Sequence, residues 1–187
     1  MNETAFWIGL IIHMLLFAMF ALSYMSSGRF QFWPPPSKES WQYHFLWWSL
    51  RLLIVCIAWG IYAENSSLNF PIWLRFYLAM PAFIVLFFLG TIAASQLGWR
   101  NTHGEAVNFV TTGFYKYSRN PQYVLYSASF LFLGVWAASL YAIILLSLLS
   151  LWYLLAPFSE EQWLEKQYGE IYTIYKNKVP RYLGSGK

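Results

Sequence analysis

Two short polar segments carry the residues of this chain that could do chemistry. Residues 109–123 read FVTTGFYKYSRNPQY and separate two long apolar stretches, and Ser159-Glu160-Glu161 follows the second stretch. The chain contains no G-x-G-x-x-G, P-loop, H-E-x-x-H or C-x-x-C motif. A cofactor site, if the protein has one, must therefore be built from helix ends and loops, and these two segments offer the side chains for it.

The composition is that of an integral membrane protein. Of the 187 residues, 58% are hydrophobic and only 11% are charged, whereas an ordinary soluble domain has roughly 25% charged residues. The single Cys56 lies in an apolar run, which excludes a disulfide framework and a cysteine-rich metal site. The net charge of +4 comes from basic residues that flank apolar spans, which favours membrane topology over nucleic-acid binding.

The apolar stretches predict an all-α membrane bundle of about five spans in a single domain, residues 1–187. A helix needs about 20 residues to cross a bilayer. Residues 124–158 are too many for one crossing, and the small residues near their midpoint suit a tight helical hairpin. The expected spans are therefore about 6–24, 45–62, 72–95, 124–136 and 139–158.

The distribution of Lys and Arg predicts the orientation of this bundle. The loops at 26–43 and 96–123 and the tail after 159 hold ten of the twelve Lys and Arg residues. By the positive-inside rule the N-terminus lies outside, and the elements 96–123 and 159–183 are cytoplasmic. We expect these two elements to form the site together.

The tail after the last span predicts an amphipathic helix at the cytoplasmic membrane surface. Ser159 and Gln162 have the spacing of a capping box, which would place Glu160 and Glu161 in the first helical turn, where the helix dipole favours carboxylates. Apolar side chains then recur at spacings of three and four residues up to Tyr175, and Pro180 ends the pattern.

Three polar residues inside the predicted spans need an explanation. Arg51 either faces a polar cavity, where it would bind substrate, or snorkels to the interface, and the sequence leaves both readings open. Arg75 stands in the first turn of its span and is expected to snorkel. His13 is expected to make an interhelical hydrogen bond, because no second metal ligand stands at helical spacing, and we predict no metal site.

The order of motifs in the second half resembles the isoprenylcysteine carboxyl methyltransferases and the related phospholipid N-methyltransferases. The resemblance covers roughly residues 90–183. It rests on V-T-x-G-x-Y at 110–115, Y-S-R-N-P-x-Y at 117–123, the helical hairpin, Glu160-Glu161, and Y-G-x-x-Y-x-x-Y at 168–175 with V-P-R at 179–181.

The resemblance implies a five-span enzyme that binds S-adenosylmethionine in a cytoplasmic pocket with a lipid-accessible opening. By motif position, Phe109 and Val110 line the adenosine pocket and Tyr115 closes over it. Glu160 holds polar groups of the cofactor, while Glu161 supports it or pairs with Arg119. The wall at the top of the fourth span is expected from Asn120, Pro121, Gln122 and Tyr123. Of all these residues, the ones expected to be catalytic are Arg119, Tyr123 and Glu161.

The expected reaction is direct transfer of the sulfonium methyl to a membrane lipid or a small amphipathic acceptor. Asn120 stands where the carboxyl methyltransferases have histidine, and Ala156 stands where they have a substrate-binding arginine, so a prenylcysteine carboxylate is disfavoured. A general base, where the acceptor needs one, would be a glutamate, Tyr123 or His103.

Two other classes of function compete with a methyltransferase. One is an NADPH-dependent membrane reductase of the sterol reductase type, which shares a similar helical hairpin, although the loops show no evident arginine cluster for the extra phosphate. The other is a non-enzymatic membrane assembly protein. The sequence leaves the oligomeric state open.

Overall fold

The computed structural model describes residues 2–26, 29–64, 67–105 and 108–183, and in these ranges the chain forms helices and loops without strands. The predicted all-α fold is confirmed. The elements, in chain order, are α1 (Asn2–Met25), α2 (Trp41–Glu64), the π-helical η1 (Trp73–Ala79), α3 (Met80–Leu97), α4 (Trp99–Thr102), the 3-10 turn η2 (Gly113–Lys116), α5 (Pro121–Ala137), α6 (Leu140–Tyr168) and α7 (Glu170–Lys178).

Four helical stretches in the described ranges are long and apolar enough to cross a membrane: Glu3–Met25, Trp41–Glu64, Trp73–Leu97 and Leu140–Tyr168. The fifth apolar helix, α5, has only 17 residues and packs against α3 and α6. The outer faces of α1, α2 and α3 carry large exposed apolar side chains such as Met14, Ile54 and Phe88. Such faces need lipid around them, and the chain is an integral membrane protein.

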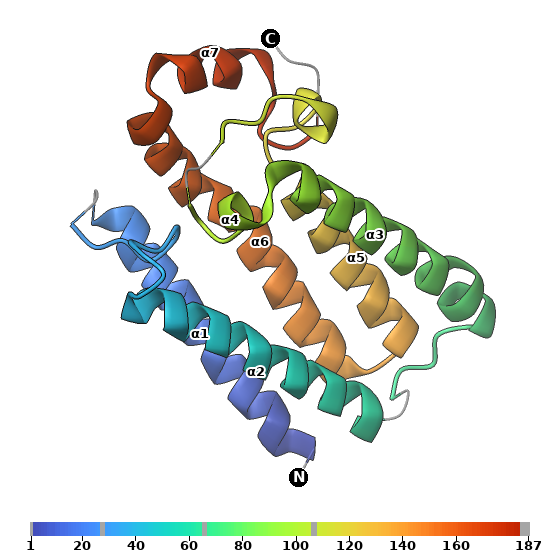
Figure 1. Cartoon of the computed structure of the whole chain (residues 1–187). Helices are drawn as coiled ribbons and strands as arrows, with labels where there is room; N and C mark the ends of the chain where they lie inside the picture. Colours follow the sequence, from blue (N-terminus) through green and yellow to red (C-terminus); the bar gives the residue numbers. More distant parts are fainter. Residues whose placement is uncertain (1, 27–28, 65–66, 106–107, 184–187) are drawn as a thin grey trace.

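Helix α6 is the centre of the bundle. It contacts α1 and α2 on one side and α5 on the other, while α3 packs on α5 (Figure 1). Its C-terminal part continues beyond the bundle, where α7 folds back beside the loop that carries η2 (Figure 1). The residues of one end of α6 therefore belong to the apolar core, and those of the other end belong to a polar assembly.

The α5–α6 hairpin is locked by polar contacts from both neighbouring connections. Ala138 adopts a left-handed conformation with φ of 53°, and the Ser139 hydroxyl accepts a hydrogen bond from the Ala142 amide at 3.2 Å. The Glu64 carboxylate accepts hydrogen bonds from the Ser139 hydroxyl and the Tyr141 amide. Arg75 Nε donates to a carbonyl in the last turn of α5, that of Trp136, at 2.9 Å. An acidic side chain at the start of a helix and a basic one at the end of a helix are both stabilised by the helix dipole.

The expected environments of two spanning residues differ from those in the structure. Arg75 does not merely snorkel, since it binds the end of α5. His13 is buried, but its Nδ1 pairs with the Gly9 carbonyl of the same helix at 2.9 Å, so the expected interhelical bond is wrong. No group of three or more potential metal-ligating side chains is found among the described residues.

The predicted capping box at Ser159 is also wrong. Helix α6 runs without a break from Leu140 to Tyr168, with Pro157 inside it. The Ser159 hydroxyl donates instead to the Trp33 carbonyl at 2.6 Å, a partner that lies too far away in the sequence to be inferred. The helix ends only at Gly169, whose φ of 56° suits glycine, and there α7 begins.

We predict that Arg75→Met lowers the free energy of unfolding by about 1–2 kcal/mol, because the carbonyl end of α5 loses a charged donor. Unfolding of the purified protein in mixed micelles, followed by circular dichroism, measures the change. Arg51→Met is the matched control, since Arg51 is exposed on α2 and binds no helix end. Equal losses in the two variants would contradict the assigned role of Arg75.

Candidate functional site

A narrow pocket lies at the end of the bundle where α6 emerges. Its lining comes from the α3–α4 corner, Glu105 and residues 108–110, η2, the start of α5, the end of α6 and α7. The space between these elements amounts to about 540 Å³ with the open mouth included. The two polar segments singled out from the sequence thus meet in one site.

One wall of the pocket is aromatic. The ring of Phe109 lies 5.0 Å from that of Tyr168, 6.0 Å from that of Tyr172 and 5.4 Å from that of Tyr175, measured between centroids. The Tyr175 hydroxyl donates to the Tyr115 carbonyl at 2.6 Å, which joins α7 to η2. These contacts bury Tyr172 and Tyr175, whereas Ile171 and Ile174 of the same helix stay exposed.

A buried carboxylate forms the floor. Glu160 Oε2 accepts a hydrogen bond from the Tyr123 hydroxyl at 2.6 Å and a longer one from Trp33 Nε1 at 3.4 Å. All three side chains are buried, and the three residues come from α6, α5 and the loop between α1 and α2. Both hydrogen bonds use Oε2, which leaves Oε1 as the carboxylate oxygen without one.

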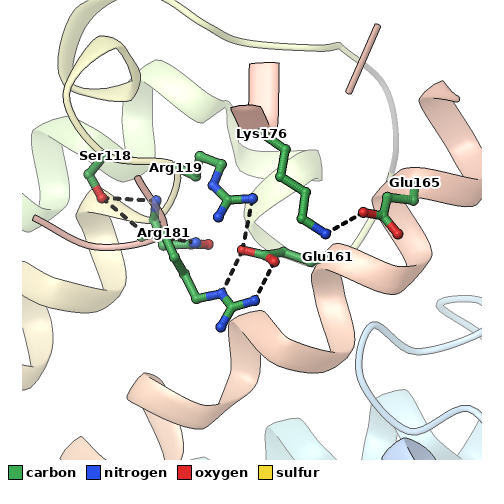
Figure 2. Close-up of polar contacts among 7 residues, drawn as sticks. Ser118, Arg119, Glu161, Glu165, Lys176 and Arg181 are labelled. Carbon is green, nitrogen blue, oxygen red and sulfur yellow. Dashed lines mark hydrogen bonds and ion pairs between the residues drawn. The ribbon is translucent and has the colours of Figure 1, made fainter. Parts of the chain in front are cut away.

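Glu161 is shared by two arginines (Figure 2). Arg181 binds it with two hydrogen bonds, from Nε at 2.8 Å and from Nη2 at 2.7 Å, and its guanidinium stacks 4.1 Å from the centre of the Phe158 ring. On the other side Arg119 Nη1 lies 3.3 Å from Glu161 Oε1. The Glu161 side chain is only 4% exposed, so the two cations replace the water that it loses on burial.

Backbone contacts reinforce this arrangement. The Arg119 amide donates to the Pro180 carbonyl at 2.9 Å, and Asn120 Nδ2 donates to the Arg181 carbonyl at 3.1 Å. Proline at the first position of α5 ends the loop without losing a helical hydrogen bond. The C-terminal segment around Pro180 and Arg181 is therefore hydrogen-bonded to the start of α5.

Glycine is required where η2 begins. Gly113 has φ of 61°, a conformation that L side chains rarely adopt, and a Cβ there would collide with Gln96 Oε1. That oxygen accepts the Phe114 amide at 3.0 Å, which fixes η2 to the end of α3. The close approach presents Tyr115 to the pocket.

The structure brings most of the predicted site residues together. Those that line the pocket are Phe109, Val110, Tyr115, Arg119, Asn120, Gln122, Tyr123 and Glu160. Pro121 and Glu161 lie behind the wall. Arg51 lies elsewhere, in an apolar hollow on the outer face of α1 and α2, where its guanidinium sits 5.0 Å from the centre of the Trp48 ring. His103 stacks on Trp47, with ring centroids 4.4 Å apart.

Sequence reasoning missed three contributors. Arg181 belongs to the terminal V-P-R motif, and the rigid Pro180 before it is the one local sign that its side chain is held in place. The amphipathic pattern places Tyr172 on the apolar face of a helix expected at the membrane surface, whereas this residue lines the pocket. The sequence does not indicate that Trp33 belongs to the site. Its one local feature is the run of three prolines that follows it, and its partner Glu160 lies 127 residues away in the chain.

Several buried polar atoms of the lining have no hydrogen-bond partner within the described part of the chain. They are Arg119 Nε, Gln122 Oε1 and the Tyr115 hydroxyl; Arg119 Nη1 has only the ion pair with Glu161. Buried polar groups almost always have partners. A guanidinium, an amide oxygen and a hydroxyl left in this state around one pocket fit a polar ligand with both acceptor and donor groups.

We predict that Glu161→Gln lowers the free energy of unfolding by about 3 kcal/mol, because it leaves a buried arginine without a counter-ion. Glu165→Gln, one turn further along α6, is the matched control (Figure 2). Its pair with Lys176 is only half-buried, with side chains 39% and 36% exposed, and should contribute less than about 1 kcal/mol. Denaturant unfolding of both variants decides the matter, and equal losses would contradict a structural role for the buried pair.

Alkaline pH should loosen the aromatic wall. Burial raises the pKa of the Tyr172 and Tyr175 phenols above their ordinary value, which is about 10. The folded protein thus holds these protons more tightly than the unfolded chain, so their contribution to stability is complete below about pH 10 and is lost above it. The thermal unfolding midpoint should fall over that range, and less steeply in Tyr172→Phe. An unchanged slope in that variant would contradict the assignment.

Comparison with known proteins places this site in a family. The family model for phospholipid methyltransferase matches residues 72–171, a segment that contains the pocket residues from α3 to the end of α6. No curated protein and no solved structure gives a significant match. The matched segment covers more than half of the 187 residues, and the chain belongs to the phospholipid methyltransferase family, one of integral membrane methyltransferases.

Proposed function

We propose that the protein is an S-adenosylmethionine-dependent membrane methyltransferase, and that the pocket around Phe109 and Glu160 holds the cofactor. The observation that carries the proposal is the set of unpartnered buried atoms on Arg119, Gln122 and Tyr115. These atoms converge on one aromatic pocket inside the segment that matches the family.

The residues fit the chemistry of this cofactor. Its carboxylate needs a cationic donor, and Arg119 has Nε without a hydrogen-bond partner, while Nη1 pairs with Glu161. Its ammonium and sulfonium need anionic or electron-rich neighbours, which Glu160 and the tyrosine rings provide. Its adenine needs a flat aromatic surface and an amide partner, and Phe109 and Gln122 are suited to these roles.

The protein contributes mainly position and exclusion of water. When bound, the cofactor supplies the methyl group on a positively charged sulfur. Tyr123 and Trp33 hold Glu160 Oε2 in place, and the ion pair with Glu161 holds Arg119 from behind. Fixing both ends of a ligand in a dry pocket lowers the entropic cost of reaction. We propose a lipid-like or small amphipathic acceptor that reaches the pocket from the bilayer.

The same proposal assigns the pocket to the cytoplasmic side. Its loops and tail carry most of the Lys and Arg residues of the chain, whereas the α5–α6 turn at the other end of the bundle has none nearby except Arg75. This asymmetry supports an outside N-terminus.

The reductase alternative is weaker in this geometry. Arg119 is the one Lys or Arg among the described residues that line the pocket, so these residues offer a single cation. The additional phosphate of NADPH requires a cation of its own beside the rest of the dinucleotide. An assembly protein without a ligand would leave the unpartnered buried atoms without an explanation.

Titration calorimetry with S-adenosylhomocysteine tests the proposal. We expect saturable binding that weakens about tenfold or more in Glu160→Gln and Arg119→Gln, because each variant removes a charged hydrogen bond of about 1.5–3 kcal/mol. Glu165→Gln, on the same helix but outside the pocket, should bind normally. Absence of binding by the folded wild type, or binding of NADPH in its place, would refute the assignment.

A further inference from the structure

An apolar hollow on the outer face of the bundle carries two basic side chains. The hollow lies between α1 and α2 and encloses about 1050 Å³ with its open mouth included. Most of its lining is apolar, and the basic side chains are those of His44 and Arg51. It shares no lining residue with the pocket around Phe109 and Glu160, so it is a separate site.

The side chain of Arg51 extends toward the end of the bundle that carries the pocket. Helix α2 begins at that end (Figure 1), where the preceding loop binds Glu160 through Trp33. Arg51 stands ten residues after Trp41, about 15 Å along the helix at about 1.5 Å per residue. Its guanidinium lies 5.0 Å from the centre of the Trp48 ring, one turn nearer to the start of α2, because helical side chains lean toward the N-terminus. The cation therefore snorkels toward the lipid head groups on the pocket side.

No acidic side chain in the described ranges compensates this charge. No Asp or Glu among these residues lines the hollow, and neither His44 nor Arg51 forms an ion pair with any of them. The guanidinium contacts the Trp48 ring and donates no hydrogen bond within the described chain. A charge on a lipid-facing helix is costly without a partner, so the donors of Arg51 are available to an anion from outside the protein.

The lining residues of α2 change from polar to apolar in the order of a phospholipid. His44, Trp48, Arg51 and Val55 recur at spacings of three and four residues, which places them on one face of the helix. All four side chains are exposed. His44 is nearest to the start of α2 and Arg51 follows two turns later, whereas Leu52 and Val55 lie deeper. The hollow thus offers hydrogen-bond donors at its shallow end and an apolar surface at its deep end.

We infer that this hollow binds an anionic phospholipid of the leaflet on the pocket side. Its phosphate would accept hydrogen bonds from Arg51 and His44, and one acyl chain would lie along Leu52 and Val55. A zwitterionic lipid fits less well, because its ammonium would find no carboxylate in the described lining. Basic pockets of this kind at the ends of membrane helices bind anionic head groups. The inference is independent of the proposed methyl transfer.

A second copy of the chain is a poorer occupant of this face. Two parallel copies that met through it would bring their Arg51 side chains to the same depth in the membrane. The acidic residues of α1 and α2 are Glu3, in the first turn of α1, and Glu64, at the end of α2. Both positions lie at the end of the bundle away from the pocket (Figure 1), so neither would neutralise Arg51 of the other copy.

Native mass spectrometry of the full chain in dodecylmaltoside tests the inference. Dioleoylphosphatidylglycerol and dioleoylphosphatidylcholine share their acyl chains and phosphate and differ in head-group charge. We expect phosphatidylglycerol to bind with a Kd about tenfold or more below that of phosphatidylcholine, the difference expected for one charged hydrogen bond. It should also raise the thermal unfolding midpoint, since a ligand of the folded state stabilises that state. Equal Kd values, equal stabilisation by inorganic phosphate, or a dimer in place of lipid adducts overturns the inference.

Two exposed cations provide matched variants. Arg51→Met should raise the Kd for phosphatidylglycerol about tenfold, to the level of phosphatidylcholine, and His44→Phe should raise it less. Lys116→Met removes the same charge from the exposed surface of η2 and should leave both Kd values unchanged. Without added lipid, all three variants should unfold at the wild-type midpoint. An unchanged Kd in Arg51→Met, or an equal loss of affinity in Lys116→Met, overturns the inference.

Discussion

The architecture of the polar end depends on one buried carboxylate shared by two guanidinium groups. Glu161 lies near the end of α6, Arg119 precedes α5 and Arg181 follows α7. A charge at this depth is tolerated only when it is fully paired, so the three segments must arrive together. The pocket exists because this meeting point holds Arg119 at its edge and closes α7 over its aromatic wall.

At the opposite end of the bundle, charged side chains also hold helices together, but each one binds a single helix end. There Glu64 faces the start of α6 and Arg75 faces the end of α5. Each charge matches a helix dipole. Among the described residues, the charges at this end thus hold helices together and those at the other end surround the pocket, while Arg51 lies apart on the outer face of α2.

The helices and the composition of the pocket could be predicted from the sequence, because they follow from local patterns. Apolar length predicted the helical bundle, and the order of motifs predicted the wall from Phe109 to Tyr123. The local patterns failed where a long-range partner changed the outcome. Ser159 resembles a helix cap until Trp33 is placed beside it, and no spacing rule connects those two residues. Arg181 could not be assigned to Glu161 before the path of the tail was known.

Helix α6 runs without a break from the apolar bundle to the pocket. A single helix of 29 residues is about 44 Å long at 1.5 Å per residue, which exceeds the hydrocarbon thickness of about 30 Å. Glu160 and Glu161 are carried on the part beyond the apolar core. The length of α6 thus allows one helix to cross the hydrocarbon and still hold Glu160 and Glu161 beyond it.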